Sequence, residues 1–212
     1  MKKTEPFTIG NTYHVYNCGI NGCKIFKDNE NYIYFMQLYS KYLTGIFFDT
    51  FAYVLMPNHF HFLLRVNEYP HKYEGFNPAT PDRVPNPVRG FKTNPSQQIS
   101  KLFNAYAQAF NKRYKRHGAL FERPFKRKRI TSDTNLRNVV IYIHNNPVHH
   151  GYCDHVKDYK WSSYRTFLST SPSKLKREEV IRWFDDVENF KYMHSRKMET
   201  THIEEWLEIG NH

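Results

Sequence analysis

A β-hairpin is predicted near the middle of the chain by the segment Val54-Leu55-Met56-Pro57-Asn58-His59-Phe60-His61-Phe62-Leu63-Leu64. Strongly β-forming residues on both sides of a Pro-Asn turn indicate two strands, at residues 47–55 and 59–66. Because strand side chains alternate, His59 and His61 share one face, and the phenylalanines beside them point into the core. Two imidazoles about 7 Å apart on one strand face can close on a single divalent ion, although they can equally be surface histidines of a sheet.

Further elements are expected on both sides of this hairpin. Before it, a strand is expected at residues 13–17 and a helix at residues 28–43, which Gly45 ends. After it, residues 67–95 contain six prolines and predict a long Pro-rich loop.

Two helices and one strand follow the loop. Ser96 is expected to cap the first helix, and a strand is expected at residues 125–130. The second helix is expected at residues 133–145, because Asn146-Pro147 should terminate it. The order strand, helix, strand, strand, helix, strand, helix predicts an α+β fold, a ferredoxin-like antiparallel sheet with packed helices.

The composition indicates one domain with an appended tail. Of the 212 residues, 40% are hydrophobic and 17% aromatic, which is enough to form a core. Lys and Arg number 31 against 20 Asp and Glu, and the net charge of +11 indicates a polyanionic partner. Residues 173–212 have seven bases and nine acids, so residues 1–172 carry the whole excess. We therefore expect a main domain at residues 1–172 and an accessory C-terminal helical tail at residues 173–212.

The sequence also predicts where the protein resides. No apolar run approaches the roughly 18 residues of a membrane span. The first six residues lack the apolar stretch of a signal peptide. We expect a soluble, cytoplasmic protein with no membrane partner.

A basic run covers residues 112–129, before the helix that is expected at residues 133–145. It sets nine bases against one acid within eighteen residues, and aromatic residues are interleaved with them. Phosphate contacts combined with aromatic stacking platforms are typical of proteins that bind single-stranded or hairpin nucleic acid, although a solvated cationic face is the alternative. The nine candidate DNA-binding residues are Lys112, Arg113, Lys115, Arg116, Arg123, Lys126, Arg127, Lys128 and Arg129.

A helix flank near residue 140 provides further candidate site residues. At 100° per residue, Asn135, Asn138, Tyr142 and Asn146 fall together beside the buried stripe. Asn146 can offer a carbonyl oxygen as a third metal ligand, and Tyr142 can offer a phenolic oxygen as a nucleophile. The alternative is that Tyr142 is simply one of the sixteen tyrosines and is half buried without a catalytic role.

Several segments resemble those of the single-tyrosine HUH transposases, in particular the REP-associated branch. The hairpin segment at residues 54–64 resembles the signature of this family. The resemblance runs in the same order from about residue 8 to residue 168. The other similar segments are Tyr13-His14-Val15, Lys24-Ile25-Phe26, Gly118 to Lys126, Tyr142-Ile143-His144-Asn145-Asn146-Pro147-Val148 and Asp158 to Tyr164.

This resemblance implies a specific site and reaction. It implies a ferredoxin-like fold whose central sheet carries His59 and His61, which hold Mg²⁺ or Mn²⁺ together with Asn146. It implies that Tyr142 is the catalytic nucleophile, which forms a 5′-phosphotyrosine link to single-stranded DNA beside a hairpin. A phosphodiester exchange of this kind needs no ATP, and the sequence contains no GxxxxGK[ST] phosphate-binding loop.

Two other functions stay open from the sequence. A domesticated, non-catalytic protein that binds DNA hairpins would keep the same fold. A metal-dependent phosphodiesterase would use an activated water in place of the tyrosine. The sequence leaves open whether the protein is a monomer or a homodimer, and whether Tyr142 completes its own active site or that of a partner.

Overall fold

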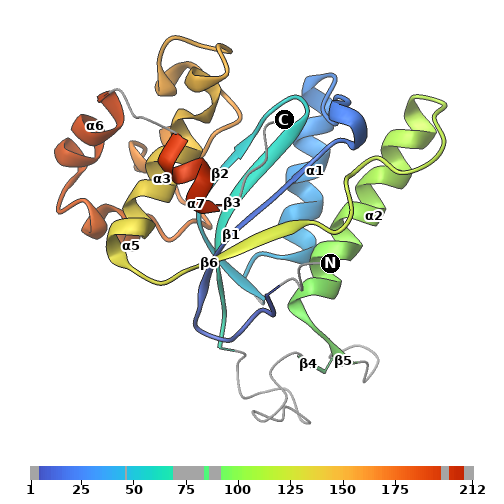
Figure 1. Ribbon diagram of the computed structural model, residues 1–212, viewed down its shortest axis with the longest axis horizontal. Helices are drawn as coiled ribbons and strands as arrows, with labels where there is room; N and C mark the ends of the chain where they lie inside the picture. Colours follow the sequence, from blue (N-terminus) through green and yellow to red (C-terminus); the bar gives the residue numbers. More distant parts are fainter. Residues whose placement is uncertain (1–4, 46, 69–83, 86–91, 197–200, 208–212) are drawn as a thin grey trace.

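The computed structural model describes residues 5–45, 47–68, 84–85, 92–196 and 201–207, and its main sheet has four strands (Figure 1). They lie in the order β2-β3-β1-β6, and all neighbouring strands are antiparallel. One helix connects β1 to β2 and another connects β3 to β6, which is the ferredoxin-like arrangement. The predicted α+β fold is therefore confirmed. The strands and these helices are β1 (Thr12–Cys18), α1 (Asn29–Tyr42), β2 (Phe48–Leu55), β3 (His59–Val66), α2 (Pro95–Arg113) and β6 (Lys126–Ile130).

Shorter elements and a third long helix, α3, complete the described structure. Most of the predicted Pro-rich loop at residues 67–95 lies outside the described residues, apart from a two-residue pairing of β4 with β5. The remaining elements are η1 (Ile20–Gly22), β4 (Val84–Pro85), β5 (Lys92–Thr93), α3 (Asp133–His149), η2 (Val156–Asp158), α4 (Tyr164–Phe167), α5 (Arg177–Trp183), α6 (Val187–Ser195) and α7 (Thr201–Leu207).

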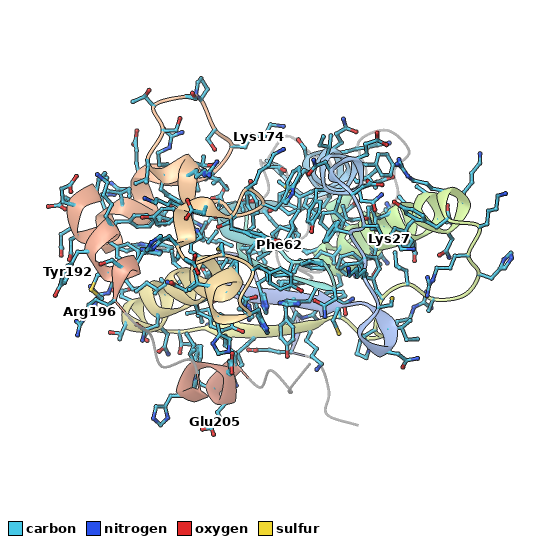
Figure 2. All side chains as sticks on the ribbon, turned by 90° about the horizontal axis from the view of Figure 1, so that it is seen from above. Lys27, Phe62, Lys174, Tyr192, Arg196 and Glu205 are labelled. Atoms are coloured by element: carbon cyan, nitrogen blue, oxygen red, sulfur yellow. The ribbon has the colours of Figure 1, made fainter. Side chains whose placement is uncertain are left out.

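One face of the sheet is covered by α1 and α2 (Figure 1). The phenylalanines of β3 point to this face, as predicted, and Phe62 lies near the middle of the molecule in Figure 2. Phe62 stacks on Tyr39 of α1, with ring centroids 4.7 Å apart, and Phe35 of α1 meets Tyr106 of α2 edge to face at 5.0 Å. Aromatic pairs of this geometry add to the stabilisation from buried area. This face is therefore the main hydrophobic core.

The other face of the sheet is covered by α3 and by the tail (Figure 1). Leu63 of β3, Val139 and Val140 of α3, and Val180 and Phe184 of the tail belong to one buried cluster. The tail is helical, as expected, but it is divided into α5, α6 and α7. The boundary at residue 172 stays a prediction.

The start of α2 differs from the prediction that Ser96 caps it. The N-cap is Asn94, whose side chain accepts a hydrogen bond from the Gln97 backbone N–H, while the Gln97 side chain accepts one from the Asn94 backbone. Pro95 then occupies the first helical position, where the N–H that proline lacks would have no helical partner. The Ser96 hydroxyl instead accepts a hydrogen bond from Arg127.

The end of α3 also differs from the prediction. The helix does not stop at residue 145 but continues through Pro147 to His149. Proline removes one backbone N–H, and hydrogen bonds after it hold the final turn: the His150 N–H donates to the Asn146 carbonyl, and the Tyr152 N–H donates to the Pro147 carbonyl. Asn146 is therefore a helical residue one turn after Tyr142, and not part of a frayed end.

Buried histidines connect α3 to α6. His144 Nδ1 lies 2.9 Å from His194 Nε2, and His144 Nε2 lies 2.8 Å from the Ser163 hydroxyl. His194 Nδ1 lies 2.7 Å from the Phe190 carbonyl. Burial lowers the pKa of His194 to about 4 and also lowers the pKa of His144. Both imidazoles are therefore neutral members of a hydrogen-bonded chain that connects α6 of the tail to α3 and Ser163. The Ser163 hydroxyl also lies 3.2 Å from the Tyr53 carbonyl of β2.

Lowering the pH from 7 to 5 should reduce the free energy of unfolding by roughly 2 kcal/mol through His194 alone. The His194 pKa is about 4 in the folded chain and about 6.5 when unfolded. The unfolded chain binds more protons between these values, so stability falls as the pH drops through this window. Urea unfolding at both pH values measures the change. Equal free energies at pH 7 and 5 would contradict the prediction.

Candidate active site

The two histidines of β3 share the sheet face that packs against α3. The ring centroids of His59 and His61 lie 5.2 Å apart, with the ring planes at 81°. Only 6% of His59 and 2% of His61 is exposed. They are therefore not surface histidines, and the burial of two imidazoles on one strand needs polar partners.

Those partners come from α3. The Tyr142 ring meets the His61 ring edge to face, with centroids 5.5 Å apart, and Asn146 Oδ1 lies 2.9 Å from His59 Nε2. Tyr142 and Asn146 are one helical turn apart, so both reach the histidines from the same side of α3. The sequence placed them on a polar flank, but both are buried against the sheet. One chain thus brings all four predicted residues together.

Both ring nitrogens of His59 lie within hydrogen-bond distance of an amide oxygen. His59 Nδ1 lies 2.8 Å from Asn58 Oδ1, and an amide oxygen only accepts, so the proton is on Nδ1. Nε2 then directs a lone pair at Asn146 Oδ1, which is also an acceptor. A separation of 2.9 Å matches adjacent ligands about 2.1 Å from a six-coordinate Mg²⁺. The donor set therefore fits a divalent cation, or a second proton on His59.

The third member of this donor set is an amide oxygen. Among the described residues, no group of three His, Cys, Asp or Glu side chains could hold a metal ion. An amide oxygen is a ligand that suits Mg²⁺ and Mn²⁺, whereas imidazole nitrogens bind several divalent transition metals. The residues that could hold the ion are His59, His61 and Asn146.

A third histidine, which the sequence did not single out, lies beside the pair. His14 of β1 is fully buried, its Nε2 lies 2.9 Å from His61 Nδ1, and burial lowers its pKa to about 3. Strand alternation places His14 and Tyr16 on one face of β1. Only the register of β1 on β3, in which Tyr16 lies opposite His61, shows that this face adjoins the candidate site.

The environment of Tyr142 favours the neutral phenol. Burial raises its pKa well above the ordinary value near 10, and the carboxylate of Glu204 in α7 adds to the rise. Glu204 Oε1 also lies 3.6 Å from Nε2 of His149 at the end of α3. Ile203 and Leu207 of α7 belong to the same buried cluster as Tyr142. To act as a nucleophile, Tyr142 must therefore lose its proton with the assistance of a group other than these neighbouring side chains.

The predicted basic run separates into bases with internal partners and bases near the site. Arg113 forms ion pairs with Asp28 and Glu30. Arg127 lies over the Phe7 ring, with its guanidinium carbon 4.2 Å from the centroid. Both side chains thus contact groups of the protein itself, Arg113 at the exposed surface, and these contacts do not by themselves indicate a DNA-binding surface.

Other bases of the run lie on the face of the candidate site. In the pairing of β1 with β6, Lys126 lies opposite Tyr16 and Lys128 lies opposite His14, so both lysines share the histidine face. Lys126 is exposed, and β6 is an edge strand of the sheet. The other exposed members of the run are Lys112, Arg113, Lys115 and Arg123.

A separate cavity of about 640 Å³ lies on the far side of α3 from the sheet. His149 from the end of α3, Tyr164 of α4 and Lys191 and His194 of α6 are among its lining residues, with Arg196 at the outer edge of the tail in Figure 2. None of Tyr142, His59 and His61 lines it. It is therefore not the candidate active site.

A ferredoxin-like sheet presents a His-x-His strand to a tyrosine, and an asparagine one turn later completes the set. No family model matches the chain. Among the described residues, no helix is both long and apolar enough to span a membrane.

Comparison with known proteins points to one group. The chain is 29% identical over 117 residues to a Haemophilus influenzae protein named "Putative REP-associated tyrosine transposase". The match covers 55% of this chain and 59% of that relative, which is less than two thirds of its length. A solved structure of a REP-associated tyrosine transposase bound to a REP hairpin has a TM-score of 0.58 and 15% identity. That comparison covers 81% of this chain and 88% of the other, and it shows a shared fold.

Replacement of Asn146 by alanine should weaken Mn²⁺ binding by roughly tenfold or more, because it removes the amide oxygen next to His59. Calorimetric titration of the DNA-free chain with Mn²⁺ measures the affinity. The neighbouring Asn145→Ala is a matched control, since the Asn145 side chain donates only to the Ile141 carbonyl within the helix. Equal affinities for the two variants would exclude Asn146 as a ligand.

Proposed function

We propose that this chain is a tyrosine transposase that cleaves and rejoins single-stranded DNA at hairpin sites through a 5′-phosphotyrosine intermediate. The observation that supports it most is the position of Tyr142, whose ring centroid lies 5.5 Å from that of His61. The names of the similar proteins point the same way. On this proposal the partner is hairpin DNA and the protein acts in the cytoplasm.

The proposed cleavage exchanges one phosphodiester for another. The Tyr142 phenolic oxygen attacks the scissile phosphorus and gives up its proton, while the bond from phosphorus to the 3′ oxygen breaks. The leaving 3′ oxygen takes up a proton and becomes a hydroxyl. Rejoining is the reverse reaction with another 3′ hydroxyl. Because a phosphodiester is conserved in each step, no ATP is needed.

The other residues of the site hold the reacting groups. His59, His61 and Asn146 would hold Mg²⁺ or Mn²⁺, and such an ion neutralises charge on the phosphate and orients it for in-line attack. The rigid helix fixes Tyr142 relative to Asn146 at one turn. Because a single chain brings these residues together, the proposal assigns Tyr142 to the site of its own chain.

Tyr142→Phe should abolish the covalent protein–DNA adduct, with a loss of at least about 100-fold, and leave hairpin binding nearly unchanged. The phenol oxygen is the proposed nucleophile, and the ring that packs on His61 remains. A denaturing gel with labelled hairpin DNA and Mn²⁺ measures the adduct.

The buried Tyr164 offers a matched control, and Tyr164→Phe should keep the adduct. An adduct that persists in Tyr142→Phe would identify another nucleophile. Free cleaved ends without an adduct in the wild type would support the phosphodiesterase that uses water. Tight binding without any cleavage would support the non-catalytic hairpin binder.

Lys126→Ala should weaken hairpin binding and reduce the slope of log K against log salt concentration by about 1, because an exposed lysine on the histidine face would contact one phosphate. Fluorescence titrations at several salt concentrations measure the slope. Lys174→Ala is the control: Lys174 lies opposite α7 in Figure 2 and donates to Ser40. Equal slopes for both variants would place the DNA elsewhere.

A further inference from the structure

The ring of His14 is joined to that of His61 edge to edge. The ring planes differ by only 11°, the centroids lie 5.0 Å apart, and His14 Nε2 lies 2.9 Å from His61 Nδ1. The N–H bonds and lone pairs of imidazole lie in the ring plane, so two nearly parallel rings with nitrogens 2.9 Å apart can share one N–H···N hydrogen bond. This bond defines the orientation of the His61 ring.

The same bond determines which nitrogen of His61 can bind a cation. Nδ1 is engaged by His14, so only Nε2 can act as a ligand, and the His61 proton must then be on Nδ1. With a cation on Nε2, His61 would donate and His14 would accept through Nε2, which leaves the His14 proton on Nδ1, a buried atom with no hydrogen-bond partner among the described residues. His59 has the same arrangement, because the Asn58 oxygen holds its Nδ1 proton and Nε2 faces Asn146.

His14 itself is held in place on several sides. Its ring stacks beside Tyr16, with centroids 5.2 Å apart, and meets the Tyr142 ring edge to face at 6.3 Å. The β1–β3 pairing fixes the backbone, since Tyr16 lies opposite His61. Because the His14 ring is held by these contacts, it can keep the His61 ring in one plane and in one tautomer.

We propose that His14 is a positioning residue of the divalent-cation site, which holds His61 as the Nδ1-protonated tautomer with Nε2 directed at the ion. This inference rests on the metal site of the proposed function. His14 takes no part in the reaction with DNA and acts only through His61. Hydrogen-bond partners of metal-bound histidines commonly contribute 10-fold to 100-fold in metal affinity.

Two substitutions at this position separate the hydrogen bond from packing. In His14→Gln the amide oxygen can accept from His61 Nδ1, and the Mn²⁺ affinity should stay within about threefold of the wild type. In His14→Phe the ring volume is kept and the acceptor is lost, so the Mn²⁺ affinity should fall by roughly 10-fold to 100-fold. Calorimetric titration of the full DNA-free chain with Mn²⁺ measures both, and urea unfolding without metal shows that the variants are folded.

A second measurement needs no metal. In the ¹⁵N NMR spectrum of the metal-free chain with labelled histidine, His61 should be protonated at Nδ1 in the wild type and in His14→Gln. In His14→Phe it should become a mixture of tautomers. A role in packing alone would not change this signature.

The outcomes separate this inference from the proposed function. Wild-type affinity in His14→Phe, equal losses in both variants, or a wild-type His61 protonated at Nε2 would each overturn the role of His14. A wild-type chain that binds no Mn²⁺ would overturn it together with the metal site. Tight Mn²⁺ binding that depends on His14, without a DNA adduct, would refute the transposase and leave the inference standing.

Discussion

The antiparallel pairing of β1 with β3 is the constraint on which both halves of the molecule depend. In this register Tyr16 lies opposite His61 and Cys18 lies opposite His59. Side chains alternate along both strands, so one register sends the aromatic residues to α1 and α2 and the histidines to α3. A slip by one residue would exchange the two faces, with phenylalanines at the site and imidazoles in the aromatic core. The stability of the core and the geometry of the site are thus fixed by the same hydrogen-bonded ladder.

The sheet face that packs against α3 contains buried polar side chains, whose burial costs free energy. His14, His59, His61 and Asn146 are nearly inaccessible, and each costs free energy unless it is hydrogen-bonded. His14 bonds to His61 and His59 bonds to Asn58, whereas His14 Nδ1 and Asn146 Nδ2 have no hydrogen-bond partner among the described residues. The apolar cluster around them includes residues of the tail. The burial of these side chains strengthens the electrostatic interactions between them.

Local sequence signals were sufficient for much of the fold. The hairpin, the shared face of His59 and His61, and the order of strands and helices follow from alternation and from turn residues, which act over a few positions. The prediction that Asn146-Pro147 ends the helix was wrong, because bonds from His150 and Tyr152 hold the final turn. The prediction that Ser96 caps α2 was wrong, because Asn94 and Gln97 form a capping box two residues earlier. His14 was missed because its role depends on the register between strands 47 residues apart in the chain.

β6 is an edge strand, and its basic side chains affect which molecules can lie alongside the sheet. Among the described residues β6 pairs only with β1, and four of its five residues are Lys or Arg. The opposite edge is partly occupied, because β2 forms single bridges to Leu175 and Ser162. A second copy that approached β6 strand to strand would meet like charges, which discourages extension of the sheet into an aggregate. A phosphate backbone would instead be attracted to the exposed Lys126 at the same edge, so a charge that repels another β-strand would favour a nucleic acid.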